Sequence, residues 1–163
     1  MEGSYAQATA NNTKLDLGKG DFTIQVWADQ TVQNEAVLIE KFTGETGPGW
    51  TFYNLGSSLQ FYADGALILS ADVNLQSGVW QQFVVERSGS TISLYFDGQL
   101  AGSGPVSGSV GASGNPLLVG ARNSQDGRNF TLDGEIDEVA MWKRALSSSE
   151  ILKLWNGGKG RKL

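Results

Sequence analysis

Short segments in which apolar and polar residues alternate recur along most of this chain, separated by turns that contain glycine. In residues 21–27, for example, Phe22, Ile24 and Val26 fall on one side of an extended chain. A period of two is typical of a β-strand with one buried face. The sequence predicts further strands at 37–42, 50–55, 59–63, 66–71, 78–87 and 117–120, and a hairpin at 91–100. Their close spacing predicts an all-β protein built as a sandwich of two antiparallel sheets.

The turns between these segments support the same fold. Asp64-Gly65 and Asp97-Gly98 each stand between two predicted strands. Two-residue hairpin turns favour glycine, because it adopts a positive φ without steric cost. Residues 102–116 are rich in glycine and serine, and we expect them to form a long surface loop inside one domain, since a strand follows them.

One domain accounts for the length. The chain has 163 residues, of which 40% are hydrophobic and 18% charged, which is enough to bury a core without cross-links. We expect the domain to span residues 1–157 and the basic tail, residues 158–163, to be flexible.

Several kinds of site are excluded by composition. The chain has no cysteine and no histidine, so it lacks thiol nucleophiles, thiolate ligands and imidazole bases, and its oxygen ligands suit hard cations such as calcium. The formal net charge of −5 argues against a nucleic-acid partner. No apolar run reaches the length of a membrane span, and no signal peptide is recognisable, so we expect no membrane insertion.

The carboxyl-terminal part combines a strand, a cluster of acids and a helix start. Residues 134–142 alternate as a strand, and Ser147 and Glu150 have the spacing of a capping box. A short helix from Ser148 to Trp155 is predicted to follow, with Gly157 ending it.

Residues 134–151, GEIDEVAMWKRALSSSEI, resemble the closing signature of LamG-like jelly-roll domains of the concanavalin A-like lectin/glucanase superfamily. Residues 21–27, 78–87 and 94–98 also resemble this family, although Gln81 and Gln82 stand where histidines are usual. The resemblance covers about residues 2–151. It implies a concanavalin A-like jelly roll with one short carboxyl-terminal helix and one concave sheet face.

The acidic run 135–138 resembles the catalytic strand of laminarinase-type glucanases, in which two glutamates face the same way. Strict alternation places Glu135 and Asp137 on one face and turns Glu138 to the other. The next positions on the first face, directly or across a bulge, are Val139 and Ala140. With one usable glutamate, the sequence predicts that this chain is not an enzyme.

The same resemblance implies a metal role for Asp137. It would be a side-chain ligand of a structural calcium ion, with Glu2 or a nearby carbonyl completing the site. The alternative is that Asp137 forms hydrogen bonds with the loop 129–134 and binds no metal. The residues leave both open.

Sugar binding needs exposed aromatic rings beside amides and carboxylates. Trp80, Trp142 and Trp155 are expected to be structural. Other polar and aromatic side chains lie out of phase with apolar neighbours and could line the concave face: Gln25, Trp27, Tyr53, Tyr62, Gln81, Ser93 and Tyr95. The polar loops 44–49 and 123–129 are a further option.

The function that these observations predict is a non-catalytic carbohydrate-binding or lectin-like module, binding a glycan or a glycosylated surface. It would belong to a larger extracellular, cell-surface or phage structural protein, beside neighbouring domains or on a virion. The alternatives are a structural or protein-interaction module without glycan binding, and a glycoside hydrolase of laminarinase type.

Overall fold

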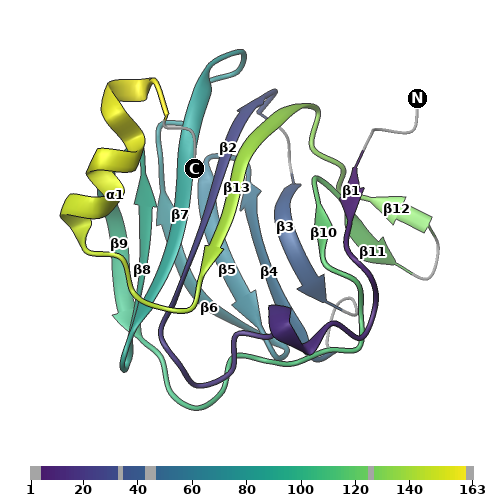
Figure 1. Cartoon of the computed structure of the whole chain (residues 1–163). Helices are drawn as coiled ribbons and strands as arrows, with labels where there is room; N and C mark the ends of the chain where they lie inside the picture. Colours follow the sequence, from purple (N-terminus) through teal and green to yellow (C-terminus); the bar gives the residue numbers. More distant parts are fainter. Residues whose placement is uncertain (1–4, 33–34, 43–46, 125–126, 161–163) are drawn as a thin grey trace.

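The alternating segments form two antiparallel sheets packed face to face in the computed structural model, which describes residues 5–32, 35–42, 47–124 and 127–160 (Figure 1). The first sheet has six strands in the order β1-β10-β3-β4-β5-β6, and the second has five in the order β13-β2-β7-β8-β9. A separate hairpin, β11-β12, lies beside the first sheet. The predicted all-β sandwich is confirmed.

The elements have the following bounds: β1 Ala6–Gln7, η1 Thr13–Leu15, β2 Phe22–Gln30, β3 Ala36–Phe42, β4 Gly49–Leu55, β5 Ser58–Ala63, β6 Ala66–Asp72, β7 Trp80–Ser88, β8 Thr91–Phe96, β9 Gln99–Pro105, β10 Leu118–Val119, β11 Arg122–Ser124, β12 Gly127–Asn129, β13 Gly134–Trp142, α1 Ser148–Trp155 and η2 Asn156–Gly158.

The two hairpin turns form as the sequence predicts. Gly65 has φ +80° and Gly98 has φ +73°. The predicted loop 102–116 is partly wrong, because β9 extends to Pro105. Glycine is needed there for close packing: a Cβ atom on Gly102 would lie 3.1 Å from that of Ala71 in β6.

The core lies between the two sheets and is built on aromatic rings. Phe61 lies 5.9 Å from Phe22 and 6.5 Å from Trp50 between ring centroids, and Phe83 lies 5.4 Å from Phe96. Such rings bury large apolar areas and dominate core energetics. The inward faces of both sheets are therefore committed to stability.

The carboxyl-terminal helix α1 covers part of the outer face of the second sheet. Ile151 of α1 joins Leu146, Val84 and Tyr95 in a second buried cluster. The helix spans Ser148–Trp155 with the predicted capping box, and it ends at Asn156, whose φ is +51°, one residue before the predicted glycine. Among the described helices, none is long and apolar enough to cross a membrane.

The chain continues to pack after α1. The Asn156 side-chain amide donates a hydrogen bond to the carbonyl of Gly160 at 2.9 Å, and Gly160 is buried. Residues 158–160 of the predicted tail therefore lie against the sandwich, and residues 161–163 lie outside the described part.

Candidate functional site

The predicted binding residues do not share one surface. Tyr53 and Tyr62 lie on β4 and β5 of the first sheet, and the other five lie on the second sheet: Gln25 and Trp27 on β2, Gln81 on β7, and Ser93 and Tyr95 on β8. The outer faces of the two sheets point away from each other. The expectation of one common concave face is wrong, because alternation gives each residue's phase on its strand but not the sheet to which the strand belongs.

The amides of the second sheet are used internally. Gln82 donates from Nε2 to Oε1 of Gln25 at 2.8 Å and accepts from the N–H of Gly98 at 3.1 Å. Gln25 donates from Nε2 to the carbonyl of Glu138 at 3.3 Å. Both side chains are fully buried, so their hydrogen bonds stabilise this face of the sheet.

Tyr95 lies beneath α1, and Ser93 precedes it by two residues on the same face of β8. Tyr95 is 8% exposed and packs against Ile151, and burial raises the pKa of its hydroxyl. Ser93 is buried and forms a hydrogen bond with Glu86. Burial raises the pKa of the Glu86 carboxyl, although the bond from Ser93 acts in the opposite direction. The helix therefore closes this part of the outer face.

The phase predicted for Gln81 is wrong. Gln81 shares its phase with the core residues Phe83 and Val85, and Gln82 is the outward residue. Gln81 accepts a hydrogen bond from the N–H of Gln76 at 2.9 Å and donates one to the carbonyl of Asn74 at 3.3 Å. It holds the loop before β7.

The outer face of the first sheet carries a hollow of about 170 Å³. We call it the tyrosine face and define it by the residues that line it: Glu35, Phe42, Thr51, Tyr53, Tyr62 and Arg122. Both tyrosines are half-buried, and no helix of the described chain packs on this face. It is the only place where two of the predicted binding residues meet at the surface of the first sheet.

Arg122 organises the charges of the tyrosine face. Its guanidinium lies 2.6 Å from Glu35 and 3.3 Å from Glu40, whose side chain is fully buried. The same group lies over the rings of Tyr53 at 5.6 Å and Phe130 at 4.7 Å. Two carboxylates therefore face the guanidinium of Arg122.

The tyrosines are held in place by their neighbours. The Tyr53 hydroxyl donates to Oε1 of Gln60 at 2.6 Å, and burial, together with the charge of Glu35, raises the pKa of this hydroxyl. Tyr62 meets Phe42 edge to face, with 5.6 Å between ring centroids. Both rings are therefore ordered before any ligand arrives, which reduces the entropic cost of binding.

Thr51 supplies a polar group without a partner. Its hydroxyl is buried and makes no hydrogen bond within the described part of the chain, yet Thr51 lines the hollow. A buried polar group without a partner is rare and costly. Thr51 shares the phase of Tyr53 on β4, so the alternation of β4 could have identified it. Arg122 and Glu35 carry no comparable signal, because only the tertiary fold brings them to this face.

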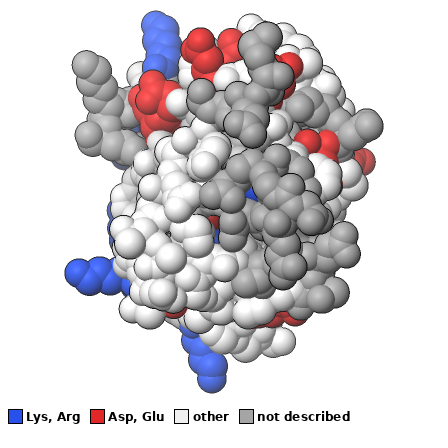
Figure 2. All heavy atoms as spheres, turned by 90° about the vertical axis from the view of Figure 1, so that its right-hand side faces the viewer, with Lys and Arg blue, Asp and Glu red and all other residues white. Residues whose placement is uncertain are grey.

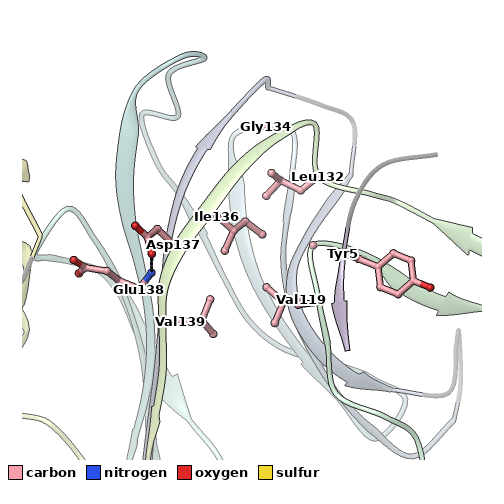
Figure 3. A pocket seen from close by; sticks show the side chains of 10 residues that line it. Tyr5, Val119, Leu132, Gly134, Ile136, Asp137, Glu138 and Val139 are labelled. Atoms are coloured by element: carbon pink, nitrogen blue, oxygen red, sulfur yellow. Dashed lines mark hydrogen bonds between the residues drawn. The ribbon is translucent and has the colours of Figure 1, made fainter. Parts of the chain in front are cut away.

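A β-bulge in β13 changes the direction of Glu138. Asp137 pairs with Trp27 and Ala140 with Gln25, so Glu138 and Val139 are both opposite one residue of β2. Glu138 has φ +47°, and its side chain leaves β13 on the same side as that of Asp137 (Figure 3). The expectation that strict alternation turns Glu138 to the opposite face is therefore wrong. The bulge does place Ala140 in the phase of Asp137, as the sequence predicts.

Both carboxylates line a hollow of about 230 Å³ on the second sheet. We call it the tryptophan hollow; its lining consists of Trp27, Trp80, Asp137, Glu138 and residues 158–160. Trp27 is 3% exposed, whereas Trp80 is 38% exposed. The expectation that Trp80 lies in the core is thus wrong, because Trp80 begins β7 at the rim; its structural role stays a prediction.

A third hollow, of about 450 Å³, opens between the edges of the two sheets (Figure 3). Apolar side chains from β10 and β13, namely Val119, Ile136 and Val139, face it together with Tyr5. Tyr5 is 45% exposed. We call this hollow the edge groove.

The oxygens near Asp137 meet only part of what calcium requires. Oδ1 of Asp137 accepts the N–H of Glu138 at 2.7 Å, a bond inside the bulge. No group of three potential ligand residues forms among the described residues, and the expected partner Glu2 lies outside them. Asp137 and Glu138 could supply carboxylate oxygens, but carbonyls and water would have to complete the six to eight oxygens that calcium takes.

The loops named as an alternative site are only partly described. Residues 44–46 and 125–126 lie outside the described chain. On the side of the molecule that carries β1, β11 and β12, the coloured basic side chains are scattered and form no continuous patch (Figure 2).

Comparison with known proteins gives a family and a fold. A family model described as the concanavalin A-like lectin/glucanases superfamily matches residues 2–152. No curated protein matches this chain.

Several solved structures share the fold at low identity. The binding domain of botulinum neurotoxin serotype G superposes with a TM-score of 0.74 at 15% identity, covering 97% of this chain and 41% of that one. The binding domain of Paraclostridial Mosquitocidal Protein 1 superposes with a TM-score of 0.69 at 17% identity, covering 97% of this chain and 42% of that one. The CBM40 of Ruminococcus gnavus IT-sialidase, in a structure with bound α2,3 sialyllactose, superposes with a TM-score of 0.73 at 11% identity. The match covers 91% of this chain and 92% of that one. The chain thus spans about two fifths of the toxin binding domains and nearly all of the CBM40.

Proposed function

This chain belongs to the concanavalin A-like lectin/glucanase superfamily, and from that premise we propose that it is a non-catalytic module that binds an uncharged carbohydrate on the tyrosine face. The observation that carries the proposal is the contrast between the two outer faces. Around Val84 and Tyr95 the outer face of the second sheet is covered by α1, whereas the first sheet keeps ordered tyrosines, a buried hydroxyl and carboxylates around one hollow. Carbohydrate-binding neighbours such as the CBM40 support the class of ligand.

Each part of the tyrosine face suits one part of a sugar. The rings of Tyr53 and Tyr62 offer apolar surface against the C–H face of a pyranose ring. The carboxylate of Glu35 accepts hydrogen bonds from sugar hydroxyls. The hydroxyl of Thr51 donates a hydrogen bond to, or accepts one from, a ligand that reaches it. Arg122 fixes Glu35 and Tyr53 in position.

The charge of the site favours an uncharged sugar. The guanidinium of Arg122 is already paired with Glu35 and Glu40. A sugar carboxylate would meet like charge there and would have to displace an internal partner. Neutral glycans should therefore bind better than sialylated ones of the same core.

A glycan array with matched neutral and sialylated structures tests this function. We expect neutral hits, and we expect Tyr62→Ala to weaken binding of the best hit about tenfold or more in calorimetry, since loss of a stacked ring costs about 1–3 kcal/mol. Tyr5→Ala, at an exposed tyrosine outside the face, is the matched control and should leave affinity unchanged. An array without neutral hits, or binding that survives Tyr62→Ala in the folded protein, contradicts the proposal.

Support for a non-catalytic role comes from the arrangement of the acids. A retaining glycosidase needs two carboxyl groups about 5–5.5 Å apart on either side of the scissile bond. On the tyrosine face, Glu40 is fully buried against Arg122, which leaves Glu35 as the carboxylate of the hollow. Asp137 and Glu138 are successive residues of one strand. Turnover of a laminarin-type β-glucan would favour the hydrolase alternative.

A second candidate function is a protein-interaction module without glycan binding, and the edge groove favours it. Its apolar lining and the exposed Tyr5 and Val139 form a surface of the kind that a protein partner covers. A glycan array that shows no binding would favour this alternative. In either case we propose that the module acts at an extracellular surface, cell surface or virion, beside other domains of a parent protein.

Calcium remains a separate proposal, centred on Asp137. If the ion binds the folded protein only, saturation to about a hundred times its Kd should add about 2.7 kcal/mol to the free energy of unfolding, which raises Tm by about 5–10 °C. The measurement is a melting curve with calcium and then with chelator, and magnesium serves as the control ion. Asp137→Asn should remove the shift. Identical curves with calcium and with chelator would show that no structural calcium is bound.

A further inference from the structure

The tryptophan hollow has the features of a binding site in its own right. It lies on the outer side of the second sheet, where β13, β2 and β7 meet the segment that follows α1. The tyrosine face lies on the other sheet. A ligand could therefore bind in this hollow whether or not the tyrosine face binds a glycan.

The indole nitrogen of Trp27 is the first observation that points to a ligand. Trp27 is 3% exposed, lines the hollow, and its Nε1–H has no hydrogen-bond partner within the described residues. An indole N–H is a donor only, and a buried one nearly always has an acceptor. The described residues therefore supply no acceptor for this indole N–H.

The acids beside Trp27 have the opposite hydrogen-bonding character. Asp137 is directly opposite Trp27 in the β13–β2 pairing, and the bulge brings Glu138 to the same side (Figure 3). Ionised carboxylates only accept hydrogen bonds. A ligand that satisfies both Trp27 and these acids must accept at one atom and donate nearby.

This combination selects the chemical class. An ammonium group donates but cannot accept from Trp27, and a phosphate accepts but meets two carboxylates beside Lys159. A hydroxyl does both, and neighbouring hydroxyls on one sugar ring can reach Trp27 and the acids together. Trp80, 38% exposed at the start of β7, offers the aromatic surface on which sugar rings stack.

The backbone around the hollow is shaped to keep these groups in place. A Cβ atom on Gly160 would lie 3.0 Å from both carboxylate oxygens of Glu138, so a glycine leaves room for that carboxylate. The hydrogen bond from Asn156 to the carbonyl of Gly160 holds the segment against the sheet. The volume of about 230 Å³ is below that of drug-sized pockets, roughly 300–1,000 Å³, and suits a single sugar ring.

We propose that the tryptophan hollow is a second saccharide site, which binds one hydroxyl-rich sugar ring through the indole N–H of Trp27, the carboxylates of Asp137 and Glu138, and stacking on Trp80. Together with the tyrosine face it would make one chain bivalent, with its two sites on opposite sheets.

The test follows the indole N–H signals of the five tryptophans by ¹H–¹⁵N NMR. The probes are methyl β-glucoside, methyl β-galactoside and methyl α-mannoside, each titrated in the presence of chelator so that calcium cannot act as a bridge. We expect the signals of Trp27 and Trp80 to move in a saturable way with at least one probe, at a Kd of about 1–10 mM. The signal of the core residue Trp50 is the internal control and should stay in place.

Variants assign the shift to this hollow. Asp137→Asn keeps the oxygen that accepts the Glu138 N–H, and with Glu138→Gln it removes both charges without loss of volume. The double variant should weaken binding about tenfold, and Tyr62→Ala should leave the Trp27 shift unchanged. The proposal is overturned if no methyl glycoside moves the Trp27 signal, or if the double variant binds as tightly as the parent protein. It is also overturned if tetramethylammonium, added as a cationic probe, moves this signal and the methyl glycosides do not. Because Tyr62→Ala reports on the other sheet alone, the two sites can fail independently.

Discussion

Replacing Tyr95 by alanine is expected to lower the free energy of unfolding by about 3 kcal/mol and to leave the glycan affinity of the folded protein unchanged. Tyr95 is buried against Ile151 and Leu146, so the smaller side chain leaves a cavity beneath α1. Urea denaturation gives the loss of stability. Calorimetry well below the unfolding midpoint gives the affinity.

Two outcomes distinguish this role from direct binding by Tyr95. Tyr95→Phe keeps the packed ring and should cost less than about 1 kcal/mol, which makes it the matched control. If Tyr95→Ala abolished glycan binding while the midpoint stayed near that of the parent, Tyr95 would be a ligand contact. The assignment of binding to the first sheet would then be wrong.

Replacing Arg122 by methionine is expected to cost about 3 kcal/mol and to remove glycan binding. The fully buried Glu40 loses a cation 3.3 Å away, and Glu35 and Tyr53 lose the group that orders them. Breaking a buried pair is costly because the remaining charge keeps its desolvation penalty. Denaturation and the glycan titration measure the two effects separately.

A second change tests the electrostatic cause. Adding Glu40→Gln to Arg122→Met removes the buried charge and should recover most of the stability, a coupling that a double-mutant cycle measures. It should not restore binding, since Tyr53 and Glu35 stay without Arg122. Additive losses in the cycle would contradict the proposed interaction between Glu40 and Arg122.

The fold could be read from the sequence because local signals agreed with each other. Alternation at 21–27, the turns at Asp64-Gly65 and Asp97-Gly98, and the capping box at Ser147 each depend on neighbouring residues alone, and all appear as predicted. Predictions from such local preferences hold in the folded protein, because the global fold is consistent with them.

The site was harder to predict because it depends on contacts between distant segments. Alternation correctly set Trp27 and Tyr53 out of phase with the core, but it could not show that β2 and β4 belong to different sheets. Nor could it show that α1 would cover Tyr95 or that Arg122 would reach Glu40, 82 residues earlier in the chain.

In the acidic strand, one β-bulge makes the side-chain directions predicted from strict alternation wrong. Strict alternation turns Glu138 away from Asp137, but the bulge between Asp137 and Ala140 adds a residue and reverses that direction. No glycine or proline marks the position of the bulge in residues 135–142, so local sequence alone could not locate it. The two carboxylates and Trp27 were therefore not recognised as neighbours.

The most direct measurement of the central claim is a backbone-amide NMR titration with the best neutral glycan from the array. The account predicts saturable shifts for residues of β4 and β5 around Thr51, Tyr53 and Tyr62, and for Arg122 beside them. A second group of shifts around Trp27 would report the tryptophan hollow and leaves this prediction intact. If the glycan binds while the amides of β4, β5 and Arg122 stay unmoved, the tyrosine face is not the binding site.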